Sequence, residues 1–316
     1  EGCLYPMTKL AFVFPGQGSQ KVGMLQDARE ACADLFAEAS SVLGYDLWDL
    51  VENGPEDQLN QTEYTQPALL TASIGLFRLA HARGLPSPDI VAGHSLGEYS
   101  ALVAAGVLQF ADAVMLVQKR GRLMQTSVPL GKGGMAAILG LDDEQVRQVC
   151  IAASQGEVVQ AANYNSPGQV VIAGNNAAIA RAIEGCKEAG ARRAMALSVS
   201  APFHSDLMKP ASEELAGVLS EVNFSKPKII ILQNVDAAAH DDPEEIRANL
   251  VKQMYGAVLW SDTVVMMRQI GVATVVECGP GKVLTGLTKR IEKSITGHSV
   301  HSAASIGIVS EALVNE

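Results

Sequence analysis

Short apolar runs alternate with longer amphipathic segments along most of the chain. The runs predict buried strands at 10–14, 89–93, 228–233 and 273–277, because a short, continuously apolar segment suits a strand covered on both faces. The longer segments predict helices at 27–43, 67–83, 96–105, 111–127, 243–254, 261–270 and 283–293. Strands that alternate with helices in this way predict an α/β fold with a parallel sheet.

The middle of the chain follows a different order. Strands are expected at 135–139, 158–164, 169–173 and 193–199, with helices at 142–153 and 177–189, and the second and third strands form a hairpin. This βαββαβ order is typical of a ferredoxin-like unit. We therefore predict a ferredoxin-like subdomain at 129–200, inserted into a discontinuous α/β catalytic domain at 7–128 and 201–316. The Ser/Ala-rich tail from Ser294 predicts a weak surface helix.

Composition narrows the class of protein. With 316 residues, 48% of them hydrophobic and 18% charged, the chain can bury a large core. The net charge of −10 and the lack of a long basic run argue against nucleic-acid binding. No apolar run reaches the length of a membrane span. The five cysteines are scattered, which suggests reduced thiols in a cytoplasmic protein and no zinc site. Residues 1–6 precede Met7, and we interpret them as residues added to the natural sequence for expression.

One motif carries nucleophile chemistry. Gly93-His94-Ser95-Leu96-Gly97 matches G-x-S-x-G and lies between a predicted strand and a predicted helix. This context predicts a hydrolase-like large domain in which Ser95 forms a covalent ester with an acyl group. Gly297-His298-Ser299 lacks the second glycine. Nucleotide-binding patterns around Gly16 and Gly279 are incomplete, so we expect no nucleotide-hydrolysing function.

A serine nucleophile needs a base, and the chain has six histidines. His94 lies on the bend and should point away from Ser95. His81 is expected on the surface, and His240 is expected to be solvated in an acidic loop. His204 lies where the inserted subdomain rejoins the sheet, so spacing favours His204 without deciding the choice.

Six motifs in one order make the chain resemble a known family. They are Phe14-Pro15-Gly16-Gln17-Gly18-Ser19-Gln20, Gly93-His94-Ser95-Leu96-Gly97-Glu98-Tyr99, Gln118-Lys119-Arg120-Gly121-Arg122, Asn165-Ser166-Pro167-Gly168-Gln169, Ala201-Pro202-Phe203-His204-Ser205 and Gly279-Pro280-Gly281-Lys282-Val283-Leu284. The chain closely resembles the bacterial malonyl-CoA:acyl carrier protein transacylases of fatty acid synthesis, over about residues 7–293. A relative that serves polyketide synthesis would look nearly the same.

The resemblance implies roles for the catalytic groups. Ser95 matches the nucleophile and His204 the general base. The backbone carbonyl of Gln253 matches the group that orients the imidazole. Gln17 and Leu96 match the two backbone N–H donors of the oxyanion hole.

It also implies how the substrate is held. Arg120 matches the residue that grips the malonyl carboxylate, and bidentate guanidinium binding suits that group. Phe203 matches a position that disfavours a methyl branch on the acyl chain, and Asn163 and Asn234 are candidate substrate contacts. Malonyl-CoA, CoA and the acyl carrier protein are the implied partners, with no metal and no cofactor, and we expect a monomer.

Acyl carrier proteins of this pathway are acidic, so an acidic enzyme needs a local basic patch to dock one. The candidates are Lys187, Arg192, Arg193, Lys282, Lys289 and Arg290. Two other functions stay open, a serine hydrolase and a non-catalytic docking module.

Overall fold

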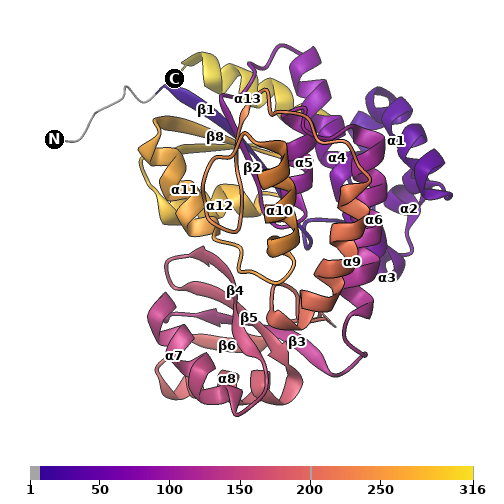
Figure 1. Ribbon diagram of the computed structural model, residues 1–316. Coiled ribbons are helices and arrows are strands. Elements are labelled where there is room, and N and C mark those ends of the chain that lie inside the picture. The colour runs from indigo at the N-terminus through magenta and orange to yellow at the C-terminus, as the bar shows by residue number, and fades with distance from the viewer. Residues whose placement is uncertain (1–7, 200, 316) are drawn as a thin grey trace.

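A five-stranded parallel sheet forms the centre of the larger part of the protein (Figure 1), which we describe from a computed structural model of residues 8–199 and 201–315. Its order is β7-β2-β1-β8-β9, and every neighbouring pair is parallel. The strands are β1 Lys9–Phe14, β2 Ile90–Gly93, β7 Ile230–Leu232, β8 Val272–Cys278 and β9 Thr296–Val300.

Helices cover both faces of this sheet. The helices of this larger part are α1 Arg29–Leu43, α2 Leu47–Asn53, α3 Glu56–Leu59, α4 Thr62–Ala82, α5 Gly97–Ala104, α6 Phe110–Thr126, α9 Lys209–Ser220, α10 Pro243–Gln253, α11 Trp260–Gln269, α12 Val283–Ile291 and α13 Ala303–Asn315. Alternate residues of β1 point to opposite faces. Phe12 and Phe14 pack against Phe77 of α4, whereas Ala11 and Val13 belong to the core under α11 and α12. Burial on both sides explains why β1 is apolar from Leu10 onward.

A second sheet lies beside the first and is antiparallel (Figure 1). Its strands β3 Gly133–Leu139, β4 Val159–Ser166, β5 Gln169–Asn175 and β6 Arg193–Ala196 run in the order β4-β5-β3-β6. Helices α7 Asp143–Ser154 and α8 Asn176–Glu188 share a separate core with it. The predicted fold class, a parallel-sheet α/β domain with a ferredoxin-like subdomain, is confirmed. The predicted domain limits stay predictions, and residues 1–6 lie outside the described residues.

Several elements differ from the prediction, and no helix was predicted at α2, α3 or α9. Helix α4 begins at Thr62 rather than at 67, so Pro67 lies inside the helix, where it has no N–H to donate to the Glu63 carbonyl. The tail is more than a weak helix, because β9 adds a parallel edge strand to β8 before α13 begins. Four of the five residues of β9 keep some exposure, so the strand lacks the apolar run that identifies buried strands.

Candidate active site

Ser95 lies at the sharp turn between β2 and α5, with a positive backbone φ of 52°. The flanking glycines allow this turn to close. A Cβ on Gly93 would overlap the backbone of Gly97, and a Cβ on Gly97 would overlap the carbonyl of Phe14. The glycines therefore let helix α5 start directly above β1, which leaves the serine at the tip of the turn.

The Ser95 side chain faces a cleft of about 320 Å³ that both parts of the protein line. The larger part contributes the loop after β1, the turn around Ser95, and α12. The smaller sheet contributes β3, β4 and β5. The lining includes Gln17, Ser95, Leu96, Arg120, Asn163, Val171, Phe203, His204 and Leu284. The cleft thus brings together segments that are far apart in the sequence.

His204 is buried beside the serine and is held on both ring nitrogens. Its Nε2 lies 2.7 Å from the Ser95 hydroxyl, and its Nδ1 lies 2.7 Å from the backbone carbonyl of Gln253. Burial, followed by the positive charge of Arg120, lowers the pKa of His204 to about 3. The imidazole is therefore neutral at pH 7. Since a carbonyl only accepts, we infer that Nδ1 carries the proton and that Nε2 accepts from the serine.

Arg120 reaches the same serine from α6 and is almost fully buried. One terminal nitrogen donates to Gln66 Oε1 at 2.9 Å. The other donates to Gln253 Oε1 at 2.9 Å and to the Ser95 hydroxyl at 3.2 Å. The guanidinium also lies over the ring of Tyr99, with 5.3 Å between its carbon and the ring centroid. Two side-chain amides thus hold a cation beside the nucleophile.

The predicted oxyanion donors both lie at the cleft. Gln17 follows β1, and Leu96 directly precedes α5. Neither backbone N–H donates a hydrogen bond to another described residue. Leu96 also lies at a helix N-terminus, where negative charge is favoured.

The remaining predicted substrate contacts do not all lie at the cleft. Phe203 and Asn163 line the cleft, as a substrate contact requires. Asn234, however, is completely buried behind the serine and is absent from the cleft lining. Its Oδ1 accepts from the Ser95 N–H at 2.8 Å, and its Nδ2 donates to the Gly93 carbonyl at 2.7 Å. Both ends of this amide are thus bonded to the protein behind the serine, and a substrate contact at Asn234 stays a prediction.

Glu98 and Gln66 are two buried polar residues to which sequence reasoning assigned no role. The carboxylate of Glu98 has no exposed surface, and burial raises its pKa to about 7. Gln66 holds Arg120 from α4. Both are polar residues within predominantly buried helical segments, and that mismatch is the sequence signal that could have identified them.

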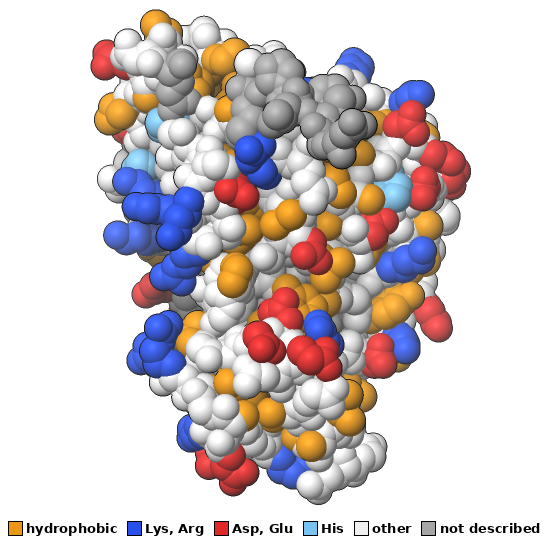
Figure 2. Space-filling view, turned by 90° about the vertical axis from the view of Figure 1, so that its left-hand side faces the viewer, with side chains coloured by type: hydrophobic (Ala, Val, Ile, Leu, Met, Phe, Trp, Pro, Cys, Tyr) orange, Lys and Arg blue, Asp and Glu red, His pale blue; other side chains and the backbone are white. Residues whose placement is uncertain are grey.

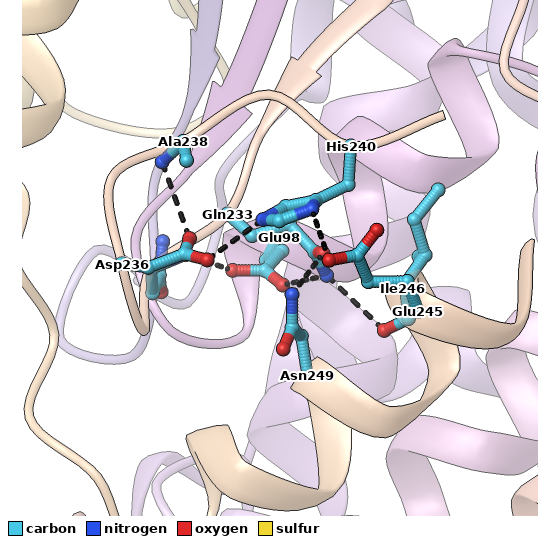
Figure 3. Close-up of polar contacts among 9 residues, drawn as sticks. Glu98, Gln233, Asp236, Ala238, His240, Glu245, Ile246 and Asn249 are labelled. Carbon is cyan, nitrogen blue, oxygen red and sulfur yellow. Dashed lines mark hydrogen bonds and ion pairs between the residues drawn. The ribbon is translucent and has the colours of Figure 1, made fainter. Parts of the chain in front are cut away.

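The other histidines do not reach the serine. His94 turns away as predicted, with Nε2 2.7 Å from Asn165 Oδ1. His240 was expected to be solvated, and this was wrong. Its ring lies between two carboxylates, 2.7 Å from Asp236 and 3.1 Å from Glu245 (Figure 3). Burial acts to lower the pKa of His240, but the two carboxylates outweigh it and raise the pKa.

Residues 8–199 and 201–315 contain no cluster of three or more His, Cys, Asp or Glu side chains that could hold a metal ion. Within the same ranges, no helix has both the length and the apolar character needed to cross a membrane.

A basic hollow adjoins the cleft. It is lined by Arg192 just before β6, by Lys289 and Arg290 of α12, and by Lys293 just after that helix. Gln169 lines both the hollow and the cleft. Figure 2 shows Lys and Arg side chains gathered along the left-hand edge of the face that it presents. Of the six docking candidates, only Arg192, Lys289 and Arg290 line this hollow, and Lys187 instead pairs with Glu184.

Comparisons with known proteins agree with this geometry. A family model described as an acyl transferase domain matches residues 11–312. The malonyl CoA-acyl carrier protein transacylase of Haemophilus influenzae is 53% identical over 98% of this chain and 100% of its own length. A crystal structure of an acyl carrier protein S-malonyltransferase from Vibrio cholerae is 54% identical, with a TM-score of 0.94 over 96% of this chain and 100% of that one. A malonyl-transacylase solved in complex with its type II PKS acyl-carrier protein is 49% identical, with a TM-score of 0.95 over 98% and 100% of the two chains.

Proposed function

This chain belongs to the family of acyl transferase domains, and from that premise we propose that it transfers a malonyl group from malonyl-CoA to the thiol of an acyl carrier protein. One observation supports the proposal above all. A single hydroxyl, that of Ser95, lies within hydrogen-bond distance of a neutral imidazole and of a buried guanidinium. The imidazole can activate the nucleophile, and the guanidinium can bind an acyl group that carries a carboxylate.

In the first half-reaction, Ser95 Oγ attacks the thioester carbon of malonyl-CoA while His204 Nε2 takes the hydroxyl proton. The negative oxygen that forms is stabilised by the N–H groups of Gln17 and Leu96, and losing one such donor typically costs ~3 kcal/mol of barrier. The carbon–sulfur bond then breaks. CoA leaves as a thiol after His204 returns the proton, and malonate remains as an ester on Ser95.

In the second half-reaction, the thiol of the carrier protein occupies the place of the CoA thiol. His204 takes the thiol proton as the sulfur attacks the ester carbon. The serine oxygen leaves and recovers the proton from His204. The same groups act in both directions, so one neutral histidine is sufficient for the cycle.

Selectivity for malonate follows from Arg120. Its guanidinium is held by neutral amides, and within the described residues it forms no ion pair. A malonyl carboxylate would supply the missing anion. Phe203 narrows the cleft near His204, which is consistent with the predicted exclusion of a methyl branch.

The basic hollow of Arg192, Lys289, Arg290 and Lys293 fits the approach of the second substrate. The hollow opens beside the cleft at Gln169. An acidic carrier protein could therefore bind to the hollow while its thiol-bearing group enters the cleft toward Ser95. We therefore assign carrier docking to these four residues.

The proposed cycle uses no cofactor and no metal. The proposed chemistry calls for no group from a second chain, and we propose that the protein acts as a monomer. Within the described residues, four cysteines (Cys32, Cys150, Cys186 and Cys278) are buried and form no disulfide. This favours a reducing compartment, and we place the protein in the cytoplasm.

The test is intact mass after brief exposure to malonyl-CoA, acetyl-CoA or methylmalonyl-CoA. The wild-type protein should gain one malonyl group and little of the other two, and Ser95→Ala should gain none. A transfer assay to carrier protein then completes the cycle. Free malonate without an adduct would instead indicate a hydrolase, and neither adduct nor turnover would indicate a non-catalytic docking module.

A further inference from the structure

Glu98 is a fully buried carboxylate in the first turn of α5. Its oxygens accept three N–H donors. Oε1 accepts from Gln233 Nε2 at 3.0 Å, and Oε2 accepts from the Asn234 backbone at 2.7 Å and from Gln253 Nε2 at 3.3 Å. No ion pair to Glu98 occurs in the described part of the chain. Since burying a carboxylate is costly, its presence behind the serine calls for an explanation.

The shortest of these contacts closes a ring with the nucleophile. The Ser95 N–H donates to Asn234 Oδ1 at 2.8 Å, and the Asn234 N–H donates to Glu98 Oε2 at 2.7 Å. The Glu98 N–H donates back to the Ser95 carbonyl at 3.0 Å. Asn234 thus binds the N–H of Ser95 and Glu98 binds its C=O, which also accepts from Gln253 Nε2 at 3.0 Å.

The ring matters because Ser95 has a strained backbone. A left-handed conformation costs a non-glycine residue roughly 1–2 kcal/mol. Such a conformation persists only where its surroundings over-determine it. The bond from Asn234 Nδ2 to the Gly93 carbonyl extends the same hold to the residue that ends β2. The ring therefore holds the turn from the side opposite the cleft.

The segment that carries Asn234 is itself anchored at both ends (Figure 3). At its start, Gln233 bonds Glu98 and accepts a hydrogen bond from Asn249 of α10 at 3.0 Å. At its far end, His240 lies between Asp236 and Glu245. Glu98 is the anchor that joins this segment to helix α5 and hence to the serine.

We propose that Glu98 is a positioning residue of the acyl transfer, which acts through Asn234 to hold Ser95 in line with His204 and the oxyanion donors. The inference rests on the function proposed above. Glu98 does not line the cleft, so it does not touch the substrate. Its loss should slow acylation of Ser95 and spare malonyl-CoA binding, because Arg120 keeps its bond to Gln66.

Two substitutions test whether the acceptor oxygen of Glu98 matters, rather than the size of its side chain. Glu98→Met keeps a similar length but offers no strong acceptor to the Asn234 N–H. Glu98→Gln keeps one oxygen, which can face that fixed backbone N–H. Its NH₂ then faces Gln233 and gives up only that bond, because the Gln233 amide stays held by the Ile246 carbonyl and by Asn249. Glu277→Met is the matched control. Glu277 is equally buried and accepts from the N–H groups of Leu284 and Thr285, but it has no bond to the Ser95 turn.

The measurement is the single-turnover rate of Ser95 acylation over a range of malonyl-CoA concentrations, by rapid quench and intact mass, per folded molecule. In Glu98→Met the maximal rate should fall on the order of tenfold or more, since small displacements of reacting groups are costly. The half-saturating concentration should change by less than about threefold, and Glu98→Gln should recover most of the rate. Glu277→Met should retain the wild-type maximal rate.

An unchanged maximal rate of acylation in Glu98→Met would overturn the inference, even if the half-saturating concentration of malonyl-CoA rose. An equal loss in Glu98→Gln would also overturn it, because charge rather than the acceptor would then matter. If Glu98→Met does not fold, Glu98→Asp replaces it, since the shorter chain withdraws the acceptor and should show the same loss. If wild-type protein gains no malonyl group, the proposed function itself fails, and that outcome is seen before any variant is compared.

Discussion

Replacing Arg120 should turn a malonyl-selective protein into an unselective one. Arg120→Ala removes a guanidinium that could give two charge-assisted hydrogen bonds to a carboxylate. At roughly 1.5–3 kcal/mol each, two such bonds correspond to about 10²–10⁴-fold in kcat/KM. Water can enter the space that alanine leaves and solvate the carboxylate in part, so we expect the lower end, about 10²-fold, for malonyl-CoA.

Acetyl-CoA should behave differently because it has no carboxylate. The charge of Arg120 helps to lower the pKa of His204, but burial is the larger cause and remains in the variant. The imidazole should therefore stay neutral at pH 7, and acetyl loading should change only by about threefold or less. The ratio of malonyl to acetyl loading therefore measures how strongly Arg120 favours an acyl group with a carboxylate.

The assay is intact-mass loading at several concentrations of each thioester, with Arg122→Ala as the control. Arg122 lies on the same helix, is exposed, and pairs with Glu63 at 2.6 Å, away from the cleft. Arg122→Ala should keep the wild-type ratio. An equal loss of malonyl and acetyl loading in Arg120→Ala would refute the reasoning, because Arg120 would then support the site without binding the acyl group.

Two further predictions concern the surface. Reversing charge in the basic hollow, Lys289→Glu with Arg290→Glu, should raise KM for the carrier protein about tenfold or more and leave malonyl loading from CoA within about threefold. An unchanged KM would place docking elsewhere. His240→Gln should lower stability below about pH 6.5, where the imidazolium pairs with Asp236 and Glu245, by about 1 kcal/mol or less since the carboxylates are partly exposed. Because the pKa of His240 is raised on folding, that difference should fade as pH rises through the folded-state pKa, and urea titrations at pH 6 and pH 9 would show it.

Much of the fold follows from local pattern. The strand at β1 and the G-x-S-x-G turn could be identified because each depends on consecutive residues, an apolar run in one case and two glycines in the other. Strand β9 could not be identified, since an edge strand with partly exposed Ser, Thr and His side chains has no apolar pattern of its own. Its strand conformation depends on pairing with β8.

The residues of the site also differ in how far the local sequence predicts them. Ser95 and its glycines can be read from one motif, whereas the partner of His204 is a backbone carbonyl and leaves no side-chain signal. The position of Asn234 depends on how the segment after β7 folds back on α5, which involves contacts about 140 residues apart. For this reason the amide could be located in the neighbourhood of the site, but its position behind the serine could not be predicted.

The carbonyl partner of His204 also affects competition between thiol and water. A carbonyl cannot neutralise an imidazolium as a carboxylate would, and burial further weakens the base, whose pKa lies near 3. A thiol with a pKa near 8.5 loses its proton far more readily than water, whose pKa is 15.7. The thiol therefore gives up its proton to the same base more readily than water does, so the lifetime of the serine ester is set by proton affinity as well as by access to the cleft.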